Sequence, residues 1–149
     1  MKALKYIFAV VTWVVILWVL PLNNCLQAQN SVQEEQQSIY DRVWILKRLN
    51  NKKIVYKQGS HPVTLVITSG NEYASGSSGC NTYVSQVVIK RNHILFRSIG
   101  CTKMACPEDS EATERIYINN LNDVDSYKII DEDLYFYKNE RPVLVFGKE

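Results

Sequence analysis

Three cysteines and two histidines are the residues of this chain that are best suited to chemistry. Cys80, Cys101 and Cys106 follow a long apolar segment, and His61 and His93 stand in polar stretches. Three thiols with a histidine could hold zinc, but the four residues between Cys101 and Cys106 only reach the edge of the usual ligand spacing. A redox-active pair would require a Cys-x-x-Cys motif and alternating strands and helices, and the sequence has neither. We therefore expect no metal and no cofactor, and surface positions for both histidines.

The acidic residues are the other candidates for chemistry. Acid–base catalysis requires two carboxylates that face each other across a substrate. Here the carboxylates gather on one predicted helix (Glu108, Asp109, Glu111 and Glu114) and in one predicted turn (Asp131, Glu132 and Asp133). Acidic side chains are favourable near the positive end of a helix dipole, so we interpret them as solvated. Because no base is placed to activate a nucleophile, we predict no catalytic residue and no enzymatic activity.

The first 28 residues have the pattern of a secretory signal. Lys2 and Lys5 precede an uncharged, mostly apolar run over residues 6–20, and Ala28 suits cleavage by signal peptidase. A retained membrane anchor is an alternative, but the run is short for a bilayer span. Lipid attachment at Cys25 is another, although Asn23 and Asn24 fit a lipidation motif poorly. All three alternatives predict export to the periplasm or cell envelope, and only the last two make the membrane a partner.

Composition divides and constrains the rest of the chain. Residues 29–39 are rich in Gln, Glu, Asn and Ser and predict a flexible tether, and residues 40–149 predict one folded domain. The whole chain has 17 basic and 15 acidic residues, with Lys2 and Lys5 in the signal. Nucleic-acid-binding proteins normally carry a basic stripe, and the balance of charge indicates none. We therefore expect no nucleic-acid partner.

Short β-branched and aromatic runs between turn clusters predict an antiparallel sheet. Trp44 is expected to anchor the core, residues 76–79 to be flexible and to form a bulge or a tight bend, and residues 98–106 to be irregular. A helix is predicted from Pro107 to Asn120, with Ala112, Ile116, Tyr117 and Leu121 on its buried stripe. The fold class is mainly β (α+β), a small barrel-like curled sheet with one helix packed on it. Strands are expected at residues 43–48, 54–56, 63–67, 73–75, 84–89, 94–96, 127–130, 134–137 and 142–146.

Two short motifs carry a resemblance to a known family. Gly79-Cys80-Asn81-Thr82-Tyr83 and Thr102-Lys103-Met104-Ala105-Cys106 follow Trp44 and precede Glu111 and Glu114. This order resembles the META domain family, also called HslJ-like, over residues 40–146. The sequence departs from the family pattern at Ser85, where a glycine is common, and in its additional Cys101. The resemblance implies a small exported or lipid-anchored bacterial domain associated with heat shock, antibiotic tolerance, motility or secretion, with no established reaction. It also implies structural roles for Trp44, Gly79, Asn81, Tyr83, Thr102 and Met104.

Removal of the predicted signal, with Cys25, leaves three of the four cysteines. An odd number of cysteines in an oxidising compartment indicates one disulfide and one free thiol, and three pairings are open. The resemblance favours a disulfide between the motif residues Cys80 and Cys106, which leaves Cys101 free. We expect a non-enzymatic domain that binds an unknown protein or a small hydrophobic ligand, with a role in stress tolerance. The alternative is a lipocalin-like carrier that holds a small ligand in the interior of the barrel. A continuous apolar cavity would favour the carrier, and a filled interior would favour the binding domain.

Overall fold

The computed structural model describes residues 38–148. The predicted signal, Cys25 and residues 29–37 of the predicted tether lie outside the described residues. The predicted fold class is confirmed, because nine antiparallel strands form one sheet with a helix packed on it. In chain order the elements are β1 (Trp44–Leu49), β2 (Lys52–Lys53), β3 (Thr64–Thr68), β4 (Tyr73–Ser77), β5 (Thr82–Lys90), β6 (His93–Cys101), α2 (Glu108–Asp123), β7 (Ser126–Ile130), β8 (Asp133–Lys138) and β9 (Arg141–Lys148).

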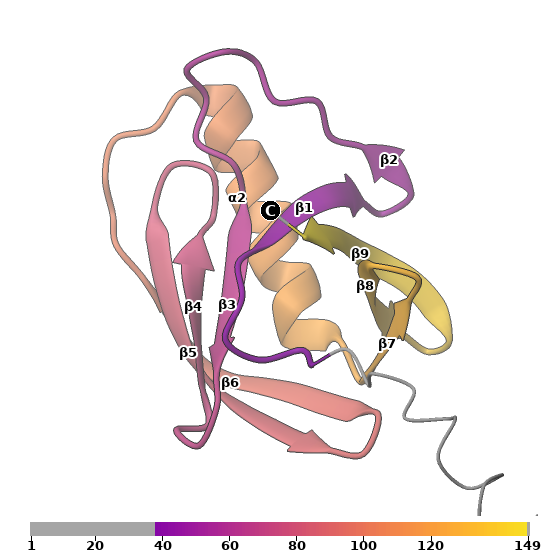
Figure 1. The fold of residues 1–149 in the computed structure, drawn as a ribbon. Coiled ribbons are helices and arrows are strands. Elements are labelled where there is room, and N and C mark those ends of the chain that lie inside the picture. Colours follow the sequence, from indigo (N-terminus) through magenta and orange to yellow (C-terminus); the bar gives the residue numbers. More distant parts are fainter. Residues whose placement is uncertain (1–37, 149) are drawn as a thin grey trace, which may run out of the picture. The chain divides into compact units, whose positions relative to one another are not determined.

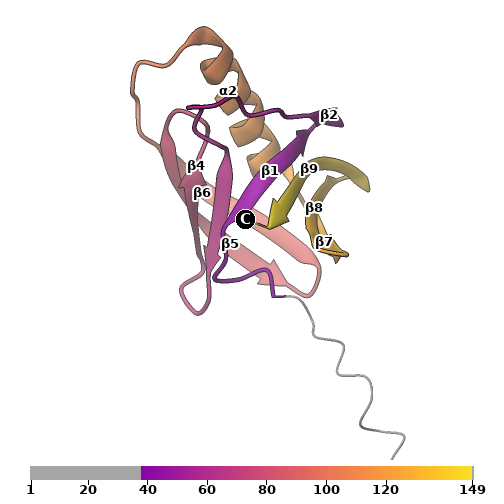
Figure 2. The ribbon, with the colours of Figure 1, turned by 45° about the horizontal axis from the view of Figure 1, so that its top comes forward.

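The sheet curls into a ring in which the first and last strands meet (Figures 1 and 2). The strands follow the order β2-β1-β3-β4-β5-β6-β7-β8-β9, and β1 pairs with β9 as well. The pairing of β1 with β3 covers two residues, whereas the pairing with β9 runs from Trp44 opposite Lys148 to Leu49 opposite Leu144. The long β1–β9 ladder is therefore the main closure of the ring on this side.

Asparagine-containing turns connect two of the hairpins. Asn50 and Asn51, between β1 and β2, have φ angles of 47° and 64°, and Asn139 and Glu140, between β8 and β9, have φ angles of 47° and 65°. Positive φ at both central residues is the geometry of a two-residue turn whose twist matches that of the flanking strands. Asparagine tolerates this region better than most residues do, so the turns set the register of these hairpins locally.

Helix α2 covers the side of the ring where the strands pair least. β6 and β7 share one residue pair, His93 opposite Ser126, and α2 packs against β6 and β9. Tyr117 and Leu121 of the helix are completely buried. Pro107 precedes the helix and its carbonyl oxygen accepts from two amides of the first turn, as its sequence position predicts. Within residues 38–148, no helix has both the length and the apolar character that a membrane crossing requires.

Aromatic side chains fill the inside of the ring. The ring centroid of Phe136 lies 5.7 Å from that of Phe96 and 5.5 Å from that of Phe146. Phe146 in turn lies 6.3 Å from Tyr117, and Tyr117 lies 5.7 Å from Tyr83. Edge-to-face pairs of this kind stabilise a fold by about 1 kcal/mol each beyond the burial of their area. The five rings therefore form a continuous core that links β5, β6, β8, β9 and α2.

Trp44 is buried, as predicted, and it fixes the start of the domain. Its Nε1 donates a hydrogen bond to the carbonyl oxygen of Ile39 at 3.0 Å, and the guanidinium of Arg42 lies 5.5 Å from its ring. Ile39 is itself buried. The composition predicts that Ile39 is part of the flexible tether, whereas its side chain belongs to the core.

The predicted strand at residues 54–56 is wrong, because the ladder of β2 ends at Lys53. The amide of Ile54 still donates to the carbonyl of Lys47 at 2.9 Å, but the chain then leaves the sheet. The hydroxyl of Tyr56 donates to the carbonyl of Leu46 at 2.9 Å and accepts from the amide of Val63 at 3.2 Å. Hydrogen bonds of the Tyr56 hydroxyl thus replace the backbone strand pairing that the β-branched residues predict.

Two more segments extend beyond their predicted limits. β6 continues to Cys101, through a region predicted to be irregular, because Ser98 adopts a φ of 53° and the register with β5 shifts there. Helix α2 runs to Asp123 rather than Asn120, and Ile116 is exposed instead of lying on the buried stripe. Ile116 lies about 100° around the helix axis from Tyr117, and the buried face passes through Tyr117.

Candidate functional site

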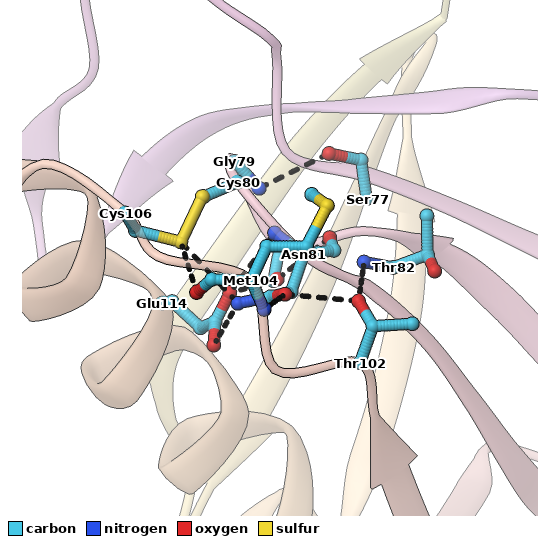
Figure 3. Close-up of a disulfide and its surroundings, with 10 residues drawn as sticks. Ser77, Gly79, Cys80, Asn81, Thr82, Thr102, Met104, Cys106 and Glu114 are labelled. Carbon is cyan, nitrogen blue, oxygen red and sulfur yellow. Dashed lines mark hydrogen bonds between the residues drawn. A yellow bond between two sulfur atoms is a disulfide. The ribbon is translucent and has the colours of Figure 1, made fainter.

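The two cysteine-containing motifs meet beside helix α2 (Figure 3). The first motif leads from β4 into β5, and the second leads from β6 into α2. Cys80 and Cys106 form a disulfide with their Cα atoms 6.0 Å apart. This is the pairing that the family resemblance favours, and it joins the two motif loops covalently.

Asn81 lies at the centre of the hydrogen bonds between these loops, and its side chain is 4% exposed. Its Oδ1 accepts from the amide of Met104 at 2.8 Å and from the hydroxyl of Thr102 at 2.9 Å. Its Nδ2 donates to Oε1 of Glu114 at 3.1 Å and contacts Sγ of Cys106 at 3.4 Å. Because a backbone amide can only donate, Oδ1 must face Met104, which fixes the orientation of the side chain. Both ends of this amide are fully engaged in holding its neighbours.

Glu114 completes the network from the helix. Its Oε2 accepts from the backbone amide of Asn81 at 3.2 Å and from the hydroxyl of Ser78. The prediction that the acidic residues of this helix are solvated is therefore wrong for Glu114, which is partly buried and bonded to the first motif. Glu114 is one of the two glutamates that carry the family resemblance, and this was the signal in the sequence for its role.

The turn between β4 and β5 is packed rather than flexible, and of the two predicted alternatives, a bulge and a tight bend, it adopts the tight bend. A Cβ atom on Gly76 would lie 2.0 Å from the carbonyl oxygen of Thr64, so only glycine lets β4 approach β3 this closely. Ser78 is buried, and its amide donates to the carbonyl of Asn81 at 2.8 Å. Gly79 adopts a φ of 103°, a conformation that strongly favours glycine. The two glycines allow a close approach and a tight turn, and they do not create mobility.

Two buried tyrosines connect α2 to the sheet behind the motif loops. The hydroxyl of Tyr83 donates to the carbonyl of Thr64 at 3.0 Å, so the hydroxyl of Tyr117, 2.7 Å away, must donate to Tyr83. Burial raises the pKa of both hydroxyls, because a phenolate there would lose its solvation. Both tyrosines therefore stay protonated at neutral pH and serve as structural links.

The remaining candidates lie at the surface or are otherwise occupied. Cys101 is free and exposed, and its thiol pKa is raised by desolvation and further by the charge of Glu114. A raised pKa lowers the thiolate fraction at neutral pH and makes Cys101 a poor nucleophile. His61 and His93 are exposed, as predicted. Ser85 is buried, and its hydroxyl lies 2.9 Å from the carbonyl oxygen of Arg97, which gives the residue a partner where the family often has glycine.

The polar side chains of this cluster hold parts of the protein together. The polar groups of Ser78, Asn81, Thr102 and Glu114 bond to one another or to the backbone. In the part of the chain that the structure describes, no three side chains of His, Cys, Asp or Glu converge in an arrangement that could hold a metal ion. The cluster therefore positions two loops and a helix, and its outward surface is what it offers to another molecule.

Beside this cluster lies a groove of about 640 Å³, which we name the loop groove. Its lining comes from most of residues 54–63, from the start of α2 and from three motif residues, Gly79, Cys80 and Met104. Met104 is 59% exposed although its amide is bound to Asn81, and Val55 is 77% exposed. Two apolar side chains are thus presented to solvent beside the disulfide.

Comparisons with known proteins agree with this fold. The family model for the META domain matches residues 37–149. An NMR structure of a protein from Burkholderia xenovorans is 25% identical, with 74% of this chain and 83% of that chain covered and a TM-score of 0.61. A second NMR structure is 14% identical over 72% of this chain and 88% of that chain, with a TM-score of 0.57, which shows likeness of fold alone. No curated protein matches the sequence.

Proposed function

We propose a function for this chain on the premise that it belongs to the META domain family, whose model it matches over residues 37–149. The chain is an exported domain of the HslJ-like group that binds an apolar segment of a partner protein in the cell envelope. It catalyses no reaction, and its contribution to stress tolerance comes through that binding. One observation carries the proposal, which is that Asn81 binds the motif loops to each other while the neighbouring motif residues Cys80 and Met104 line the loop groove.

The amino-terminal sequence and the disulfide support export. Lys2, Lys5, the apolar run over residues 6–20 and Ala28 have the order of a cleavable signal. Disulfides persist in oxidising compartments such as the periplasm and are rare in the cytosol. The bond between Cys80 and Cys106 suits an exported domain for that reason.

The shape of the loop groove supports a protein partner. Exposed aliphatic side chains gathered beside a groove are typical of interaction sites. Val55 and Met104 are contributed by different loops, and the disulfide fixes the segment that bears Met104. The interior of the ring, by contrast, is filled by aromatic side chains such as Phe96, Phe136 and Phe146. This filling supports a binding domain over the lipocalin-like carrier.

The proposal is tested by site-specific photo-crosslinking in the host cell. A photoreactive amino acid replaces Val55 or Met104, and Ile130 on β7 serves as the control because it is exposed and does not line the loop groove. We expect the same discrete adduct from both groove positions, stronger under envelope stress, and none from Ile130. No adduct from the groove, or equal labelling from Ile130, would contradict the binding role.

Export is tested separately by the intact mass of the chain recovered from its host. A mass that begins at Gln29, with a peptide linked through Cys80 and Cys106 after digestion without reductant, is expected. A lipid-sized increase at Cys25, or an uncleaved amino terminus, would change the proposed location to a membrane-attached one. A cytoplasmic, fully reduced protein would contradict export.

A further inference from the structure

Positive charge is concentrated on the β1–β2 hairpin. Residues 42–71 contain six Lys and Arg residues and no Asp or Glu, although the whole chain is close to balanced. The overall balance of charge hides this segment, so the expectation that no basic region exists is incomplete. The structure brings three of these side chains, from Lys47, Arg48 and Lys53, around one groove.

This groove, which we name the hairpin groove, has a volume of about 330 Å³. It contains none of the motif residues, although it shares Ile54 and Tyr56 with the loop groove. Its lining comes from β1, β2, β8 and β9 and the chain after β2, and β1 pairs with both β2 and β9 (Figures 1 and 2). Strand register places Arg48 opposite both Lys53 and Val145, and Val145 opposite Tyr135. Residues directly opposite each other in a sheet share a face, so the two cations and the tyrosine form one row.

The cations in this row have no counter-charge within the described structure. Like charges directly opposite each other destabilise a sheet, and Arg48 and Lys53 are so placed. Among residues 38–148, neither forms an ion pair. Asp133 is the carboxylate of the groove, and it is bound by Nζ of Lys47 at 2.6 Å. The positive charges of Arg48 and Lys53 are therefore available to bind an anionic ligand.

Gly147 leaves the space that Lys47 needs to reach and bind Asp133. A Cβ atom at Gly147 would lie 1.8 Å from Cε of Lys47, so the glycine leaves the path along which the lysine crosses β9. With this ion pair made, three cations and one carboxylate leave a net charge of two positive units in the hairpin groove. The neighbouring side chains of Tyr56 and Tyr135 add aromatic surface to it.

We propose that the hairpin groove binds a phosphate monoester carried on a ring or a short aliphatic group. A phosphate monoester bears close to two negative charges at neutral pH and matches the net charge of the groove. The guanidinium of Arg48 can grip two phosphate oxygens with parallel hydrogen bonds, and Lys53 adds a second cation. The organic part lies against Tyr56 and Tyr135. The volume is at the lower end of the range for ligand sites, which limits the ligand to a small group or a lipid headgroup.

The first test is an NMR titration of the full chain with phenyl phosphate, with phenol and inorganic phosphate as comparators. Shifts are expected at the amides of β1, β2 and β8 and at the guanidinium of Arg48, with tighter binding of phenyl phosphate than of either comparator. Arg48→Gln and Lys53→Gln should each weaken binding at least tenfold. Arg91→Gln, an exposed charge at the β5–β6 turn, should change the affinity less than twofold. Equal affinities in all variants, or shifts elsewhere, would overturn the site.

Stability and vesicle binding complete the design. Arg48→Gln is expected to leave the melting temperature unchanged or higher, because a like-charge contact is removed, so lost binding cannot be attributed to unfolding. Cosedimentation with phosphatidylcholine vesicles, with and without phosphatidic acid, distinguishes the sources of the phosphate. If phosphatidic acid increases the amount of protein that sediments with the vesicles, and Arg48→Gln abolishes this increase, the ligand is a lipid headgroup. If the protein binds phenyl phosphate but phosphatidic acid does not increase sedimentation, the ligand is a free phosphate monoester. Binding of neither probe rejects the proposal.

Discussion

The side-chain amide of Asn81 donates to the carboxylate of Glu114 across 3.1 Å, from the residue before β5 to the middle of α2. The two residues are 33 positions apart, and the same carboxylate also accepts from the backbone amide of Asn81. Hydrogen bonds to a charged group contribute about 1.5–3 kcal/mol each, more than neutral ones. This contact, together with the disulfide, therefore holds the helix against both motif loops.

Replacing Asn81 by alanine should lower the free energy of unfolding by about 3 kcal/mol, because partly buried partners on two segments, the loop with Thr102 and Met104 and helix α2, lose their hydrogen bonds. Urea denaturation monitored by circular dichroism measures the change. Asn119→Ala is the matched control, since Asn119 is exposed on the same helix that Asn81 contacts. That control should stay within about 0.5 kcal/mol of the parent. Similar losses in both variants would show that Asn81 has no special role.

Removing the disulfide should cost about 3.5 kcal/mol, because the bond spans 26 residues and restricts the unfolded chain. The Cys80→Ser, Cys106→Ser double variant should match the reduced parent in its urea midpoint and should no longer respond to dithiothreitol. Cys101→Ser should keep both the stability and the response of the parent. If Cys101→Ser instead abolishes the response, the stabilising bond involves Cys101 and the assigned pairing is wrong.

Gly76→Ala should destabilise the domain by about 2–3 kcal/mol, because the added methyl group would collide with the backbone of β3. Gly100→Ala in β6 is the comparison, since a Cβ there meets open space and its φ is negative or extended. That substitution should be neutral or stabilising by less than about 1 kcal/mol. Thermal unfolding of both variants checks the contrast, and equal effects would indicate that β3 and β4 can move apart freely.

Stability should fall above pH 10, because burial raises the folded-state pKa of Tyr83 and Tyr117 above the ordinary value of 10.0. For groups with a raised folded pKa, the stabilisation is complete below the unfolded pKa and is lost as pH rises through the folded one. Each such group costs up to about 1.4 kcal/mol per pH unit in that window. Urea denaturation at pH 9, 10 and 11 should show a shallower decline for Tyr117→Phe than for the parent. Parallel declines would contradict the assignment to these hydroxyls.

The local elements of the fold could be predicted from the sequence because their signals are local. Alternating apolar residues mark strands such as β3 and β8, and Pro107 marks the start of α2. The closure of β1 on β9 could not be predicted in this way, since pairing between distant strands leaves no local pattern. The segment at residues 54–56 shows the opposite error, in which a local pattern predicts a strand that is not formed. Its β-branched residues favour a strand, but the segment is held by the hydroxyl of Tyr56 instead of a strand ladder.

The candidate site was predictable only in part. The motifs identified Asn81 and both disulfide cysteines, but a glutamate in the first half of a helix reads as solvated unless the loops facing it are known. The prediction that Glu114 is solvated is wrong for this reason. The flexibility expected at Gly76 is wrong for a similar reason, because glycine in a sequence does not distinguish flexibility from the close approach of another strand.

The ladder between β1 and β9 also governs the order in which the domain can fold. Trp44 lies opposite Lys148, so β1 waits for a partner that leaves the ribosome about a hundred residues later. Until Arg141–Lys148 emerge, Leu46 and Leu49 lack the strand whose Phe146 and Leu144 lie opposite them. Distant pairing of this kind is slow. The sheet therefore cannot be completed until nearly all of the chain has been synthesised.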